Sequence, residues 1–207
     1  MILEPNHIYH IYNQGNNRQK IFFNQANYLY FLKKIKQHIL PFADILAWCL
    51  MPNHFHLLVV VREDQTVKPG QGSDRVTWSH PVTGPPATSP LNNSIAVMLR
   101  SYTRAINIEQ GRTGSLFREG TKANLIGSMK REMIKCQNRR KAESNDHRIE
   151  EENDLQICFN YIHNNPVKAG LVTFATDWEF SSARDIAELR AGSLINKDMI
   201  SSLGLNA

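Results

Sequence analysis

Two histidines one residue apart, His54 and His56, begin a strongly apolar run, and this run most limits what the chain can fold into. The next five residues, 57–61, are Leu-Leu-Val-Val-Val, a composition typical of a buried strand. Pro52 precedes the run, at a strand start where its missing N–H does least harm. Because residues i and i+2 of a strand point to the same face, we expect the two imidazoles to lie side by side.

Two imidazoles on a rigid strand can supply two ligands of a metal site. The alternative is chance combined with core packing, since the chain of 207 residues contains eight histidines. The spacing alone leaves both interpretations open.

Length and composition bound the class of protein. We expect residues 1–207 to form a single domain with a core of its own. Three widely spaced cysteines, the lack of a signal-peptide pattern and the lack of a long apolar run predict a cytoplasmic protein that does not enter a membrane. A net charge of +5 is compatible with a nucleic-acid partner.

Hydrophobic periodicity predicts an α+β fold. The order strand, helix, strand, strand, helix, strand indicates a ferredoxin-like or RRM-like sandwich, an antiparallel sheet with helices packed on one face. The open face of such a sheet is a common platform for single-stranded nucleic acid. The expected strands are 7–13, 42–50, 54–61 and 121–127, and the expected helices are 25–40, capped by Asn24, a second from Asn92 or Asn93 to about 110, and 154–165, ended or kinked by Pro166.

Two stretches interrupt this order. Residues 62–90 are rich in Gly and Pro, which predicts a long irregular loop or insertion. Residues 129–153 carry many charges of both signs, which indicates a solvated helix or a partly disordered insertion.

A tyrosine and an amide lie one helical turn apart in the last expected helix. Tyr161 and Asn165 therefore project from one face, as a nucleophile beside a metal ligand would. Taken alone, the tyrosine could equally serve packing and the asparagine could serve a turn. Tyr102 is the rival nucleophile, because it lies between Arg100 and Arg104 in the second helix.

Several basic and amide side chains are candidates for DNA contacts. Exposed cations are common on any surface, so a purely solvated role is the alternative for each of them. The candidates are Asn13, Arg18, Arg100, Arg104, Arg112, Arg118 and Lys122.

Five motifs occur in the order found in one known family. They are YHIYNQG at 9–15, MPNHFHLL at 51–58, GSLFR at 114–118, YIHNNPVKAGLV at 161–172 and WEFSS at 178–182. With them the chain resembles the single-tyrosine HUH transposases of the IS200-like group, most of all the REP-associated tyrosine transposases. Two stretches depart from the family pattern, because 62–90 is longer and 129–153 resembles an insertion.

The resemblance implies a transposase that cuts and rejoins hairpin-containing single-stranded DNA through a 5′-phosphotyrosine intermediate. It implies His54, His56 and Asn165 as ligands of Mg²⁺ or Mn²⁺, and Tyr161 as the nucleophile. It also implies a monomer or homodimer associated with a prokaryotic nucleoid. The alternatives are a domesticated single-stranded DNA-binding protein that no longer cuts DNA, and a metal-dependent nuclease that uses water.

Overall fold

A four-stranded antiparallel sheet forms the centre of the protein. The computed structural model describes residues 2–63, 89–142 and 154–206. The strands follow the spatial order β2-β3-β1-β4, and every neighbouring pair is antiparallel. This arrangement confirms the predicted ferredoxin-like class of α+β fold. The strands are β1 (His7–Gln14), β2 (Ala43–Met51), β3 (His54–Val61) and β4 (Lys122–Ser128).

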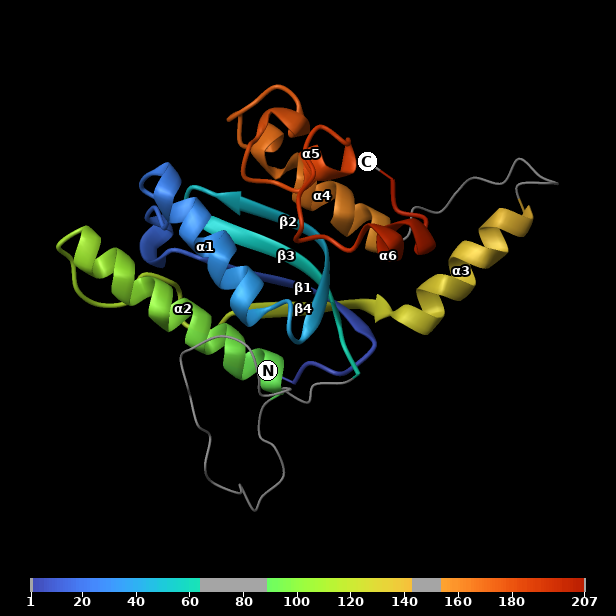
Figure 1. Cartoon of the computed structure of the whole chain (residues 1–207), viewed down its shortest axis with the longest axis horizontal. Coiled ribbons are helices and arrows are strands. Elements are labelled where there is room, and N and C mark those ends of the chain that lie inside the picture. The colour runs from blue at the N-terminus through green and yellow to red at the C-terminus, as the bar shows by residue number, and fades with distance from the viewer. Residues whose placement is uncertain (1, 64–88, 143–153, 207) are drawn as a thin grey trace, which may run out of the picture.

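One face of the sheet is covered by α1 (Gln25–His38) and α2 (Pro90–Glu109) (Figure 1). Phe31 of α1 lies at the centre of this layer, with its ring centroid 5.2 Å from that of Phe55 and 4.8 Å from that of Tyr102. Phe55 stands between the two histidines in sequence, so it points to this face and the histidines point to the other.

The second face carries α4 (Asp154–Lys168), which packs mainly against β2 and reaches β3 and β4. The sequence predicted helices on one face, and α4 adds a layer on the other. The physical reason is an apolar stripe on α4, where Leu155, Phe159 and Ile162 are almost fully buried. The helix therefore covers the face that carries His54 and His56.

Local chemistry explains where the helices begin and end. The Asn24 side chain accepts the Asn27 N–H at the start of α1, as expected. The predicted start of α2 was too late, because Ser89 caps the helix and Pro90 occupies its first turn, where a missing N–H costs nothing. Pro166 neither ends nor interrupts α4, which continues to Lys168.

The remaining elements are one helix as long as α1, which is α3 (Met129–Ala142), and four short ones. The short ones are η1 (Asn16–Arg18), η2 (Ala175–Asp177), α5 (Ala183–Ile186) and α6 (Lys197–Ser202). Helix α3 makes up the first part of the predicted insertion 129–153, while 143–153 and most of 62–90 lie outside the described residues. Among the helices in the described ranges, none combines the length and apolarity that crossing a membrane requires.

Candidate active site

Three side chains predicted as metal ligands converge where β3 begins. Nε2 of His54 lies 3.2 Å from Oδ1 of Asn165, and Nε2 of His56 lies 3.3 Å from Nδ2 of the same amide. The histidines share a face of β3, and Asn165 reaches them from α4. The structure thus joins the strand motif to the late helix motif, which are more than a hundred residues apart in sequence.

The Nδ1 atoms of His54 and His56 also have hydrogen-bond partners. Oδ1 of Asn53 lies 2.6 Å from Nδ1 of His54 and accepts a hydrogen bond from it. His10 of β1 places Nε2 2.9 Å from Nδ1 of His56, and both of these rings are buried. Sequence analysis did not select His10, because the contact depends on the register of β1 against β3, which no local pattern gives.

Burial keeps these imidazoles neutral. It lowers the pKa of His54, lowers that of His10 to about 4, and lowers that of His56 to about 2. The neighbouring rings of His54 and His10 also act against a charge on His56. A neutral imidazole keeps one lone pair, which is the form that ligates a metal.

The donor set fits a divalent cation. With Nδ1 of His54 donating to Asn53, Nε2 of His54 carries a lone pair and faces the Asn165 oxygen, which is also an acceptor. With Nδ1 of His56 donating to His10, Nε2 of His56 is a third acceptor at the same point. Three acceptors that converge with one amide NH₂ among them suit a bound cation. Within the described residues, no three His, Cys, Asp or Glu side chains gather in a way that could hold a metal ion, so the set at this point is two imidazoles and one amide.

Tyr161 lies beside these three side chains. It precedes Asn165 by one turn of α4, and its ring centroid is 5.5 Å from that of His56 and 6.1 Å from that of His10. The side chain is 38% exposed, and Nζ of Lys168 lies 5.4 Å from the ring centroid. A substrate can therefore reach the phenol from solvent.

Tyr102, the rival nucleophile, is fully buried, and its hydroxyl donates a 2.8 Å hydrogen bond to the Ile21 carbonyl. Burial raises its pKa far above the ordinary value of a phenol. These features give Tyr102 a role in the core and leave Tyr161 as the accessible phenol.

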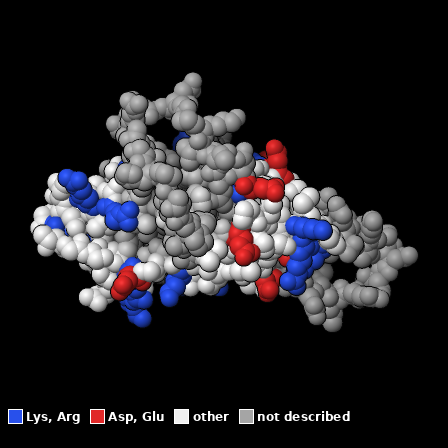
Figure 2. Space-filling view, turned by 90° about the horizontal axis from the view of Figure 1, so that it is seen from below, with Lys and Arg blue, Asp and Glu red and all other residues white. Residues whose placement is uncertain are grey.

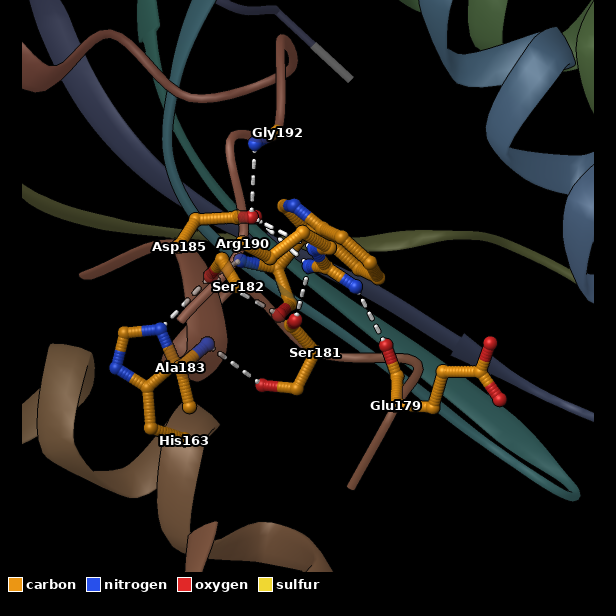
Figure 3. Close-up of polar contacts among 9 residues, drawn as sticks. His163, Glu179, Ser181, Ser182, Ala183, Asp185, Arg190 and Gly192 are labelled. Atoms are coloured by element: carbon orange, nitrogen blue, oxygen red, sulfur yellow. Dashed lines mark hydrogen bonds and ion pairs between the residues drawn. The ribbon is translucent and has the colours of Figure 1, made fainter. Parts of the chain in front are cut away.

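A buried polar network holds the tyrosine helix against β2 (Figure 3). Nε2 of His163 lies 2.8 Å from Oγ of Ser182, which accepts the Trp48 N–H at 2.9 Å and lies 3.2 Å from the Trp48 carbonyl oxygen. Burial lowers the pKa of His163 to about 4. An ion pair joins two residues that follow Ser182 in the chain. Nε of Arg190 lies 2.7 Å from Oδ1 of the buried Asp185. This network fixes the rotation of α4, and with it the position of Tyr161.

Two hollows flank Tyr161. One, of about 450 Å³, is lined by His54, His56, Arg118 and Lys122 among others. The other, of about 620 Å³, is lined by His10, His56 and Lys168 among others. Of the candidate DNA contacts, Arg118 and Lys122 thus lie next to the tyrosine.

The other candidate contacts fall elsewhere. Arg100, Arg104 and Arg112 line a groove beside α2, and Arg18 is exposed on η1. Asn13 is buried, and its amide donates to the Arg118 carbonyl and the Thr121 hydroxyl, while its oxygen accepts the Gln14 N–H. The polar atoms of the Asn13 side chain therefore all have hydrogen-bond partners within the protein. Through them Asn13 holds the segment that contains Arg118 and Thr121.

Comparison with known proteins finds a similarity among solved structures. No family model matches the chain, and no curated protein matches it. Among solved structures, the fold is similar to that of a REP-associated tyrosine transposase bound to a REP hairpin, with a TM-score of 0.52 and 16% sequence identity. The similarity covers 95% of this chain and 92% of the other. It confirms the inferred resemblance at the level of the fold.

Proposed function

We propose that this protein is a metal-dependent tyrosine transposase, a site-specific endonuclease and strand transferase for hairpin-containing single-stranded DNA. The observation that carries the proposal is the exposed Tyr161 next to the converging nitrogen and oxygen atoms of His54, His56 and Asn165. The structural neighbour, which is bound to a hairpin, supports the choice of DNA as substrate.

A divalent cation held by His54, His56 and Asn165, Mg²⁺ or Mn²⁺, would polarise the phosphoryl oxygens and stabilise the charge that develops on them. Two imidazoles among three ligands favour Mn²⁺ over Mg²⁺ by ligand type.

The chain itself supplies the nucleophile. The Tyr161 oxygen forms a bond to phosphorus as the bond from phosphorus to the 3′ oxygen breaks. The phenol loses one proton, and the departing 3′ oxygen gains one. A 5′-phosphotyrosine diester replaces the phosphodiester, so rejoining needs no nucleotide cofactor. Lys168, whose ammonium lies over the Tyr161 ring, places a positive charge close to the new phosphate.

Positive charge near the site is suited to hold the strand. Arg118 and Lys122 line the same hollow as Tyr161, where they can contact phosphates on either side of the scissile bond. Arg18 adds a cation on η1. The backbone carbonyl of Arg18 accepts a hydrogen bond from the side chain of Asn53, which precedes His54.

The test uses labelled single-stranded DNA that covers the genomic flanks of the protein's own gene. With Mn²⁺ present, we expect a DNA adduct that survives boiling in detergent, absent with EDTA and absent with the blunt duplex of the same sequence. Cleavage without an adduct would favour a nuclease that uses water. Binding without cleavage would favour a DNA-binding protein that has lost catalysis.

The contact between His10 and His56 yields a further prediction. His10→Leu removes the acceptor for Nδ1 of His56, so the ring is free to rotate or to change tautomer. Mn²⁺ affinity measured by calorimetry should fall about 10- to 100-fold. His10→Gln, which restores a side-chain acceptor, should recover most of the loss.

The control for His10 is His7→Leu, on the same strand and outside the two hollows that flank Tyr161. It should bind Mn²⁺ as the wild type does. Wild-type affinity in His10→Leu would show that His10 has no part in positioning His56.

A further inference from the structure

A groove beside α2 lies outside the hollows that flank Tyr161. It measures about 840 Å³ and lies between α2 and the loop of residues 111–121. Along α2 its wall runs from Asn92 to Ile108, and Ala96, Arg100 and Arg104 follow at four-residue steps. At 1.5 Å per residue, this wall is about 24 Å long.

Positive charge predominates along the groove. Of the described residues that line it, four are arginines and none is acidic. Within the described ranges, none of the four guanidinium groups has a hydrogen bond or an ion pair. Arg62 and Arg190, in contrast, are each paired with an aspartate. The four are Arg100, Arg104, Arg112 and Arg118.

The floor of the groove is apolar. Ile95, Leu99 and Phe117 form it, and the exposed Ile108 stands at one end. Cations along the rim with an apolar floor match a flexible chain that has phosphates on one side and flat bases on the other. A duplex presents phosphates on its outside and hides its base faces, so it would leave the floor unused.

The groove continues into the active site. Asn13, Arg118 and Gly120 line both the groove and the hollow that contains His54, His56 and Tyr161. The buried Asn13 amide holds this shared rim by donating to the Arg118 carbonyl and to Thr121. In Figure 2 several Lys and Arg side chains lie toward the end of the molecule where α2 finishes, with acidic atoms among them.

We propose that this groove is a second binding site for single-stranded DNA, which carries the strand from the scissile phosphate around the end of β1 and along α2. The proposal rests on the proposed function for the point at which the strand enters. Tyr161 is not among the residues that line the groove, so DNA binding by the groove is measurable whether or not the protein cuts DNA.

The test compares two variants that lose the same charge. Arg100→Gln/Arg104→Gln alters the groove, and Lys33→Gln/Lys36→Gln removes two exposed lysines of α1 that do not line it. The probe is fluorescein-labelled dT20, measured by anisotropy across a salt series. The groove variant should bind about tenfold more weakly, and its slope of log affinity against log salt should flatten by about 1.4, the value for two phosphate contacts on a single strand.

The control variant should stay within about twofold of wild type, and thermal melting followed by circular dichroism should show both variants folded. Equal affinity of the two variants for dT20 overturns the proposal. So does equal competition by a blunt duplex or by polyglutamate, because the groove would then accept any polyanion.

Outcomes for the groove and for the proposed function separate cleanly. If the wild type forms an adduct and the groove variant binds like the control, only the groove proposal fails. If no adduct forms and the groove variant still loses binding, the groove is confirmed and the proposed function fails.

Discussion

Tyr161→Phe should form no covalent adduct with DNA, while its fold and its affinity for hairpin DNA stay close to wild type. The change removes one oxygen from a side chain that is 38% exposed, and the ring contact with His56 remains. Without the phenol oxygen there is no nucleophile to attack phosphorus, so adduct formation should fall below detection. A denaturing gel for the adduct and a gel shift for the hairpin measure the two properties side by side.

The matched control is Tyr102→Phe, which removes the same atom from the other tyrosine near basic residues. It should cut DNA as the wild type does and lose about 1–2 kcal/mol of stability, because the Ile21 carbonyl loses its buried donor. An adduct formed by Tyr161→Phe would assign the nucleophile elsewhere.

His54→Ala/His56→Ala should bind no Mn²⁺ in a calorimetric titration. The double change leaves the Asn165 amide as the only member of the ligand set, and one amide does not hold a divalent ion at micromolar concentration. Cleavage should vanish with the metal. The control is His7→Ala/His38→Ala, which removes two imidazoles outside the site and should titrate like the wild type.

The pH dependence of Mn²⁺ binding follows from the same site. Burial lowers the pKa of both ligand histidines, so the neutral, metal-binding form persists below pH 6.5, where an exposed histidine would be protonated. Mn²⁺ affinity should therefore change little between pH 7.5 and 6. A steep loss of Mn²⁺ affinity centred on pH 6.5 would contradict this site. So would wild-type Mn²⁺ affinity in His54→Ala/His56→Ala.

Periodicity predicted most of the frame on which the site is built. The two-residue period of β3 predicted that His54 and His56 share a face of that strand. The helical period of α4 predicted that Tyr161 and Asn165 share a face of that helix. Both predictions rest on local geometry, which a sequence determines well.

Features that depend on contacts between distant segments were not predictable in this way. His10 reaches His56 only because β1 pairs with β3 in one register. Asn13 resembled a DNA contact, since a polar turn residue gives no sign that it will be buried. The Ser89 cap was missed because it lies at the end of a Gly- and Pro-rich stretch that hides the helix start.

The position of α4 on the sheet also depends on tertiary structure. Its sequence predicts a helix with an apolar stripe, but the face that this stripe covers also depends on contacts between distant segments, such as the Ser182 link to Trp48 and His163. Docking on the histidine face is what brings Tyr161 to the ligand set.

The most direct test of the proposed function is the chemical identity of the attachment site. DNA adducts formed with Mn²⁺ are digested with trypsin and nuclease, and the modified peptide is sequenced by mass spectrometry. Cleavage after Arg148 and Lys168 releases residues 149–168, in which Tyr161 is the only tyrosine. We predict a nucleotide 5′-phosphate on Tyr161 of this peptide. A phosphate on any other residue, or cut DNA with no modified peptide, would contradict the proposed mechanism.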